Sequence, residues 1–223
     1  MKMIFNSPEG KAIFIHIPKT GGNTIQKHIF DKGDSMDEMK ISGHQDGKDR
    51  FEVRGRFTSK KHMKLSEYFE YEQLRSFEIF TCIRNSLDRL VSFYFSPHRH
   101  VKRNKITGEI SYPEKVDFDI DEFAEMIEKI PTMIKILSIP SNHDIPCISS
   151  TRIPSKVKII RTENLKLDAS ALLDLEINNS SNVSPYRDSS KKAKSDPAVQ
   201  KLIFNSKHQE DQDFFYGANI NLN

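Results

Sequence analysis

Three short apolar runs stand out in the pattern of hydrophobic and polar positions along the chain. They cover residues 11–17, 77–83 and 157–160. Each run is rich in β-branched and aromatic residues and alternates little between apolar and polar positions, which is typical of strands covered on both faces of a parallel sheet. We therefore predict three buried strands.

Amphipathic segments follow or separate these runs, and their apolar residues recur at helical spacing. We predict helices at residues 24–30, 87–95, 118–130, 168–175 and 199–215. Asn23, Ser86 and Asp168 are of residue types that cap helix N-termini, and we expect them to cap three of these helices. Residues 141–155, which are rich in Ser, Pro and Asn, and residues 180–196 are predicted loops. Strands that alternate with helices predict an α/β fold with a mainly parallel sheet.

The composition fits a soluble globular protein. A length of 223 residues suits a single domain over residues 1–223, and hydrophobic residues make up 36% of the chain against 29% for charged ones. The chain has no long apolar run, so no membrane-spanning helix is expected. Residues 1–8 lack the pattern of a signal peptide, and we therefore expect a cytoplasmic protein.

The net charge and the number of cysteines bear on whether the protein binds nucleic acid, other anions or zinc. A formal net charge of +3 is too small to indicate nucleic acid by itself. Basic residues gather in residues 54–64 and 99–105, and each segment is either a solvated loop or a place where an anion binds. Cys82 and Cys147 are the only cysteines, and Cys82 lies inside the second apolar run. We expect a buried free thiol there rather than a disulfide, and two cysteines offer no zinc ligand set.

A glycine loop follows the first predicted strand. It consists of Pro18, Lys19, Thr20, Gly21, Gly22, Asn23 and Thr24. A glycine loop that enters a helix offers unobstructed backbone N–H groups and the positive end of the helix dipole, both of which attract phosphate. In nucleotide triphosphatases the lysine of this loop follows the glycines, whereas Lys19 precedes them. The pattern therefore indicates phosphate binding and disfavours ATP hydrolysis.

Two segments resemble the sulfotransferases that depend on PAPS (3′-phosphoadenosine 5′-phosphosulfate). Residues 14–24 are similar to the loop that binds the 5′-phosphosulfate, in particular in the carbohydrate branch that contains heparan sulfate 2-O-sulfotransferases. Residues 80–94 are similar to the element that binds the 3′-phosphate, in which a strand-end arginine is followed eight residues later by a helical serine, as Arg84 is by Ser92. Ser86 stands where that family usually has proline. Residues 160–165, 182–187 and 211–216 resemble later elements of the same family.

This resemblance implies a fold, a donor and a set of roles. The fold is a P-loop-like three-layer sandwich, with a central mainly parallel sheet flanked by helices. The reaction is transfer of a sulfuryl group from PAPS to an acceptor hydroxyl, which releases PAP (adenosine 3′,5′-bisphosphate) and needs no metal. Residues 19–24 are then expected to bind the 5′ end of the donor, and Lys19 to stabilise charge on the bridging oxygen. Arg84 and Ser92 are expected to bind the 3′-phosphate.

Histidines supply the candidates for a catalytic base, because this residue type exchanges protons near neutral pH. His44 follows a glycine, as a histidine does in the corresponding interval of the carbohydrate branch, and it is the predicted base. His143 lies in a segment similar to a loop near the acceptor in some relatives. It is therefore a candidate for binding the acceptor, and the alternative base if His44 is not the base. His16 falls within the first strand and is predicted to be a core residue.

The acceptor implied by the resemblance is the hydroxyl of a glycan or glycoconjugate. Lys102 and Arg103, in the second basic segment, are predicted to bind an anionic acceptor. A small-molecule or lipid hydroxyl is the alternative acceptor. Other classes of function are a nucleotide-dependent phosphotransferase and a non-catalytic nucleotide-binding protein. No nucleic-acid partner or stable membrane anchor is expected, and the sequence does not specify an oligomeric state.

Overall fold

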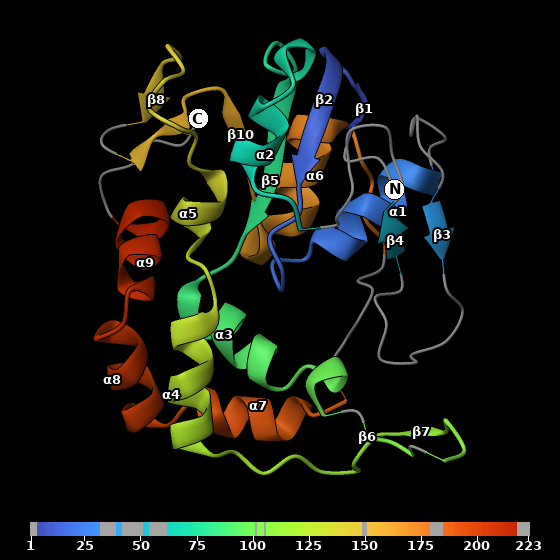
Figure 1. Cartoon of the computed structure of the whole chain (residues 1–223), viewed down its shortest axis with the longest axis vertical. Helices are drawn as coiled ribbons and strands as arrows, with labels where there is room; N and C mark the ends of the chain where they lie inside the picture. The colour runs from blue at the N-terminus through green and yellow to red at the C-terminus, as the bar shows by residue number, and fades with distance from the viewer. Residues whose placement is uncertain are drawn as a thin grey trace.

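A four-stranded sheet forms the centre of the protein (Figure 1). The structure, a computed structural model, describes residues 4–31, 39–41, 51–53, 62–100, 102–104, 106–148, 151–178 and 185–217. The strand order is β1 (Ile4–Ser7), β2 (Gly10–Ile15), β5 (Glu78–Ile83) and β10 (Val157–Arg161). Strands β2, β5 and β10 are parallel, and β1 pairs antiparallel with β2 at the edge.

The three predicted strands are confirmed, and their apolar runs are explained by burial on both faces. Residues 12–15 of β2 and 79–83 of β5 are all buried. Because neighbouring side chains of a strand point to opposite faces, a strand buried throughout must be covered on both sides. Helix α2 (Leu65–Phe69) lies in front of the sheet in Figure 1 and α6 (Leu165–Leu173) behind it. The α/β fold with a central mainly parallel sheet flanked by helices is thus confirmed.

The remaining helices surround and extend this sheet. They are α1 (Gly22–Asp31), α3 (Ser86–Tyr94), α4 (Ile120–Lys129), α5 (Met133–Leu137), α7 (Arg187–Lys194), α8 (Pro197–Phe204) and α9 (His208–Tyr216), with 3-10 turns η1 (Glu72–Leu74), η2 (Pro97–Arg99) and η4 (Thr162–Asn164). Three short antiparallel pairs are β3 (Met39–Ile41) with β4 (Phe51–Val53), β6 (Lys102–Arg103) with β7 (Ile110–Ser111), and β8 (Cys147–Ile148) with β9 (Ile153–Pro154).

Buried apolar side chains form two clusters. The larger cluster surrounds the sheet and includes residues of α1, α2, α5 and α6. The second cluster lies between α3, α4, α7 and α8, below the sheet in Figure 1. Helix α3 begins directly after β5 and contributes Leu90, Val91 and Tyr94 to the second cluster. The chain therefore passes from one cluster to the other at the carboxyl end of β5.

Several helix boundaries differ from the sequence-based expectation, because the capping side chains are not the ones that residue type alone suggested. Helix α1 already begins at Gly22, so Asn23 lies in its first turn. The N-cap of α3 is Asn85 instead of Ser86, since the Asn85 side chain accepts a hydrogen bond from the Asp88 amide at 2.8 Å. Asp168 lies inside α6. Its carboxylate accepts a hydrogen bond from the Arg161 amide at 2.7 Å, so it binds the last residue of β10 instead of capping the helix.

Two predicted loops and one predicted helix are also wrong. Residues 180–196 include α7, which sequence periodicity misses because Ala193 is its one buried residue. Residues 141–155 include the β8–β9 pair. The predicted helix at residues 199–215 is two helices, α8 and α9, separated by a turn at residues 205–207. In that turn the Ser206 hydroxyl and amide both donate to the Ile203 carbonyl, which ends α8.

The cysteine prediction is confirmed. Cys82 is fully buried in β5, and neither it nor Cys147 forms a disulfide. Burial raises the pKa of the Cys82 thiol well above its usual range, and the negative charge of Asp168 raises it further. In the part of the chain that the structure describes, no helix is long and apolar enough to cross a membrane.

Candidate active site

The carboxyl ends of the three parallel strands meet at one edge of the sheet. Ile15 at the end of β2 pairs with Thr81 of β5, and Arg161 at the end of β10 pairs with Ile83. The glycine loop, Arg84 and Thr162 come directly after these strands and therefore lie side by side. In open parallel sheets, ligands bind in the crevice outside the carboxyl ends of the strands.

The glycine loop has the backbone conformation of a tight turn into a helix. Lys19 and Gly21 adopt φ angles of 69° and 81°, in the left-handed region. For a residue with a side chain this region costs about 1 to 2 kcal/mol, so the surrounding contacts hold Lys19 in place. The Thr20 hydroxyl donates to the Ile17 carbonyl at 2.8 Å, and the Thr24 amide donates to the Gly21 carbonyl at 2.9 Å. These bonds close the loop at the N-terminus of α1.

His16 lies directly beneath this helix N-terminus. A Cβ atom on Gly22 would lie 2.4 Å from the Cδ2 atom of the His16 ring, so only glycine fits at the first position of α1. His16 is 4% exposed, which confirms its prediction as a buried residue. The second glycine is thus required by close packing, whereas Gly21 is required by its positive φ.

Thr162 braces the loop from the neighbouring strand end. Its Oγ1 atom lies 2.7 Å from the Thr20 carbonyl oxygen and 2.7 Å from the Ile83 carbonyl oxygen. The single hydroxyl proton is shared between the two acceptors, so Thr162 links β5, β10 and the loop. The only signal for this residue in the sequence is the resemblance of residues 160–165, which assigns no role to Thr162.

Lys19 and Arg84 approach one another at the centre of this edge. The Lys19 ammonium donates a hydrogen bond to the Ser96 hydroxyl at 2.7 Å, and the Arg84 guanidinium donates to the Lys19 carbonyl at 3.4 Å. Ser92 is half-buried on α3, four positions before Ser96, which lies two residues past the end of the helix. The structure therefore brings Lys19, Arg84 and the segment that carries Ser92 together, and it adds Ser96, which was not predicted.

This arrangement suits a ligand with more than one anionic group. An ammonium, a guanidinium, loop N–H groups and the N-terminus of α1 each stabilise negative charge. The hydroxyls of Ser92 on α3 and of Ser96 after it can also donate hydrogen bonds. Among the described residues, no group of three or more His, Cys, Asp or Glu side chains is placed to hold a metal ion.

A second histidine lies against the loop and was not predicted. His62 Nδ1 donates a hydrogen bond to the His16 carbonyl at 3.1 Å, and the two imidazole rings meet edge to face with centroids 4.7 Å apart. Because a carbonyl only accepts, Nδ1 is the donor in this bond, and Nε2 is then the atom that carries the lone pair in the neutral ring. That is the tautomer that a general base needs when it accepts a proton through Nε2.

The other predicted histidines have different positions. His44 lies outside the described residues, as do residues 54–61 of the first basic segment. The His143 ring packs edge to face on Phe69 of α2, with centroids 5.6 Å apart, and its carbonyl accepts a hydrogen bond from Arg152. Phe69 is a buried member of the larger apolar cluster, so the His143 ring packs at the edge of that cluster.

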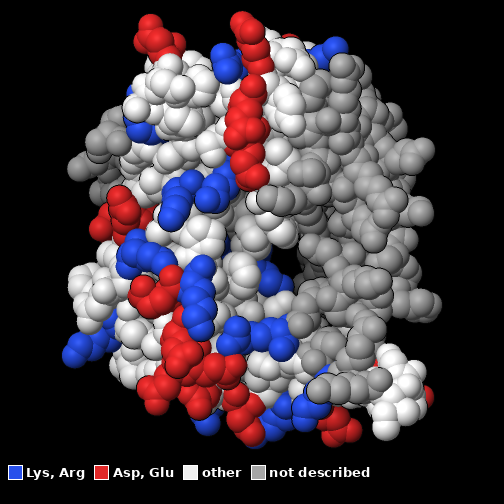
Figure 2. Space-filling view, viewed as in Figure 1, with Lys and Arg blue, Asp and Glu red and all other residues white. Residues whose placement is uncertain are grey.

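The second basic segment borders a groove. Lys102 and Arg103 form β6, and Lys102 lines a groove of about 370 Å³ together with Tyr94, Arg99, His100, Pro113, Lys115, Val116, Asp117 and Glu122. Arg99 forms an ion pair with Glu122 at 2.7 Å, so part of the basic character is neutralised. Figure 2 shows acidic side chains gathered over α4, with Lys and Arg side chains next to them.

A parallel sheet whose strand ends carry a glycine loop and an arginine, followed by a helix with hydroxyl side chains, is an α/β arrangement that suits a phosphorylated or sulfated ligand. The family model described as the sulfotransferase family matches residues 2–208, and the chain belongs to this family. Neither the curated proteins nor the solved structures yield a match. The protein is thus a transferase that moves a sulfuryl group from a sulfonate donor to an acceptor hydroxyl.

Proposed function

We propose that the protein transfers a sulfuryl group from PAPS to a hydroxyl of a carbohydrate or glycoconjugate and releases PAP. One observation carries the donor assignment: Arg84 reaches the backbone of the loop that contains Lys19, at the carboxyl end of parallel strands. A nucleotide with a phosphosulfate at one end and a 3′-phosphate at the other needs two such anion-binding groups close together.

The donor lies with its phosphosulfate on the loop and its 3′-phosphate on Arg84 and Ser92. Backbone N–H groups of residues 19–24 bind the 5′ end, since Thr20 is buried and its hydroxyl is already committed to the Ile17 carbonyl. The Arg84 guanidinium forms charge-assisted bonds to the 3′-phosphate, and the Ser92 hydroxyl adds another. A nucleotide without the 3′-phosphate leaves these groups unused, which gives the site its selectivity.

The transfer is an in-line displacement at sulfur. The acceptor oxygen forms a bond to sulfur while the bond between sulfur and the bridging oxygen of the phosphosulfate breaks, and PAP leaves with the electron pair of that bond. Lys19 stabilises the negative charge that grows on the bridging oxygen. The acceptor hydroxyl loses its proton to a base, so atoms and charges balance without a further reactant.

Two histidines are proposed for this base. His44 rests on the family resemblance, and His62 rests on its bond to the His16 carbonyl and the resulting lone pair on Nε2. His62 is also exposed, so an acceptor can reach it. Of the two, His62 has the support of geometry, because its partner His16 lies three residues before Lys19.

The acceptor is proposed to bind through the basic groove beside β6, where Lys102 and Arg103 attract a glycan that carries negative charge.

The experiment that tests the proposed function has two parts, one for the donor and one for the acceptor. Calorimetry compares PAP with AMP, and equal affinities exclude the donor assignment. Radiolabelled PAPS is then offered with a panel of sugars, glycolipids, lipids and phenols, and label on a neutral lipid or phenol with none on any sugar refutes the carbohydrate acceptor alone.

A further inference from the structure

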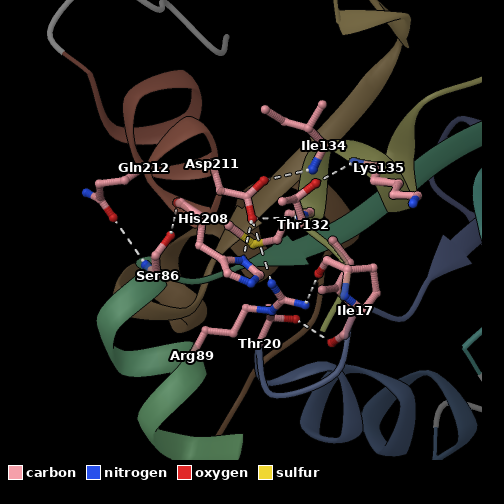
Figure 3. Close-up of polar contacts among 12 residues, drawn as sticks. Ile17, Thr20, Ser86, Arg89, Thr132, Ile134, Lys135, His208, Asp211 and Gln212 are labelled. Carbon is pink, nitrogen blue, oxygen red and sulfur yellow. Dashed lines mark hydrogen bonds and ion pairs between the residues drawn. The ribbon is translucent and has the colours of Figure 1, made fainter. Parts of the chain in front are cut away.

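A buried ion pair lies directly behind the glycine loop. Arg89 of α3 and Asp211 of α9 are 1% and 0% exposed, and the distance from Arg89 Nη1 to Asp211 Oδ2 is 3.7 Å (Figure 3). Burying two charges is costly unless each has further hydrogen bonds, so a pair at this depth has to be held by several partners. Burial lowers the pKa of Arg89 to about 10, and the carboxylate of Asp211 opposes that shift.

Asp211 organises the start of α5. Its carboxylate accepts hydrogen bonds from the Met133 amide at 2.7 Å and from the Ile134 amide at 2.9 Å. These are the first two N–H groups of a helix, which have no partner within the helix itself. The Nδ1 atom of His208 lies 3.7 Å from the same carboxylate, while His208 Nε2 donates to the Ile127 carbonyl at 3.0 Å.

Arg89 joins three segments that are distant in the sequence. Its Nη2 atom donates to the Pro131 carbonyl at 3.1 Å, next to the start of α5, and its Nε atom donates to the Pro18 carbonyl at 3.4 Å. Pro18 immediately precedes Lys19, the residue with the left-handed backbone. A planar guanidinium can serve two carbonyls and a carboxylate at once, which a lysine ammonium on a flexible stem does poorly.

We propose that Arg89 and Asp211 are positioning residues for the donor site, through which α9 fixes the Pro18 side of the glycine loop and thereby the backbone of Lys19. The pair touches neither donor nor acceptor, and it acts through the Pro18 carbonyl. This role rests on the proposed binding of PAPS for its effect on affinity. The effect on the loop itself is independent of any ligand.

Four variants test the proposal. Arg89→Lys keeps the positive charge and removes the planar guanidinium that binds several acceptors at once. Asp211→Asn keeps the size of the side chain and removes its charge. The double variant measures the coupling between the two residues. Val199→Ala is the matched control, because Val199 is equally buried but lies in α8, within the second apolar cluster. Each variant is examined by amide hydrogen exchange without ligand and by calorimetry with PAP, after its melting temperature has been measured.

We expect Arg89→Lys and Asp211→Asn each to lower the exchange protection of the Thr24 amide, which donates to the Gly21 carbonyl, by about tenfold or more, since such amides exchange through local openings. We expect each to weaken PAP binding by about tenfold, and the double variant to lose less than the product of the two, because the residues act as one unit. Val199→Ala lowers the melting temperature and leaves loop protection and PAP affinity within about twofold.

The outcomes separate this inference from the proposed function. If the parent protein does not bind PAP, the donor assignment is wrong, and hydrogen exchange still decides whether the pair holds the loop. If the parent binds PAP and the charged-pair variants weaken it no more than Val199→Ala does, the positioning role is overturned. Unchanged protection of the loop amides overturns it as well. Arg89→Lys is the milder substitution and keeps the test open if Asp211→Asn fails to fold.

Discussion

Lys19 and Ser96 are joined by a hydrogen bond of 2.7 Å between the ammonium and the hydroxyl, across 77 positions of the sequence. Ser96 is 6% exposed and directly follows α3, so the bond holds the Lys19 side chain toward the helix that also carries Ser92. A free lysine side chain samples many rotamers and loses conformational entropy when its ammonium is held at one position. The hydrogen bond to Ser96 already restricts the Lys19 side chain, so less entropy is lost when Lys19 acts on a ligand. The two elements implied in donor binding are thus connected through the lysine itself.

Lys19→Ala should reduce turnover by about 10² to 10³, because it removes a charge that stabilises the leaving oxygen in the transition state. The affinity for PAP should change much less than turnover. Steady-state kinetics with PAPS measure the first quantity and calorimetry the second. Lys27→Ala is the matched control, since Lys27 is an exposed lysine of α1 that pairs only loosely with Asp31 at 3.8 Å. A Lys19→Ala enzyme with the turnover of this control would contradict the assigned role.

Arg84→Ala should weaken PAP binding by well over tenfold, because loss of a buried charge-assisted contact costs about 2 to 5 kcal/mol. AMP, which lacks the 3′-phosphate, should bind the variant and the parent protein almost equally. Ser92→Ala should weaken PAP binding less, since a hydroxyl contributes a single neutral donor. Calorimetric titrations with both nucleotides give the comparison, and a parallel loss of AMP affinity would place Arg84 elsewhere in the site.

His62→Gln should lower turnover by about 10² to 10⁴ and leave PAP affinity unchanged, because general-base help acts on the transfer step alone. His44→Gln is the competing variant. The variant of the true base should lose the pH dependence of turnover that belongs to a titrating histidine, whereas the other keeps it. His28→Gln serves as the control, as His28 Nδ1 donates to the Thr24 carbonyl within α1. Full activity of both His62→Gln and His44→Gln would assign the proton to another group.

Charge reversal at Lys102 and Arg103 should raise the KM for an anionic acceptor and leave PAP binding unaltered. The KM of the parent enzyme should rise with ionic strength, because salt screens attraction over distances beyond about 8 to 10 Å. Reversal at the exposed Lys166 and Lys201 of α6 and α8 gives the control at equal net charge. A KM that is insensitive to salt would mean that the β6 segment is ordinary solvated surface.

Cys147 should react with iodoacetamide in the native protein, and Cys82 only after unfolding. The thiolate is the reactive form, and the raised pKa of Cys82 keeps its thiol protonated at any pH where the protein is handled. Cys147 is half-buried and its thiol donates to the Ile145 carbonyl at 3.2 Å. Mass spectrometry of labelled peptides, with and without denaturant, measures the difference. Rapid native labelling of Cys82 would show that β5 opens readily.

The pattern of apolar residues predicts the three parallel strands of the central sheet and misses the antiparallel edge strand β1. Strands β2, β5 and β10 were predictable because a strand buried on both faces is a short continuous apolar run. The placement of the glycine loop beside Arg84 followed, since parallel strands bring their carboxyl ends to one edge. Local chemistry also fixed Gly21, whose positive φ is a property of the chain at that point.

Tertiary structure alone decided the residues that hold this site in shape. Thr162 and Asp211 bind backbone carbonyls and amides of the loop or its supports, and every residue carries such groups, so the sequence does not mark the partner. Ser96 binds the Lys19 ammonium across 77 positions, a pairing that only the folded chain reveals. The partner of His62 is likewise a backbone group, the His16 carbonyl, so the sequence does not indicate this contact either. Helix α7 escaped prediction because its packing against α3 involves the Lys194–Asp88 ion pair and little apolar surface. The spacing of apolar residues along the sequence indicates only which side chains are buried. The contacts of the loop depend instead on which backbone N–H and C=O groups lack a partner once distant segments have packed together.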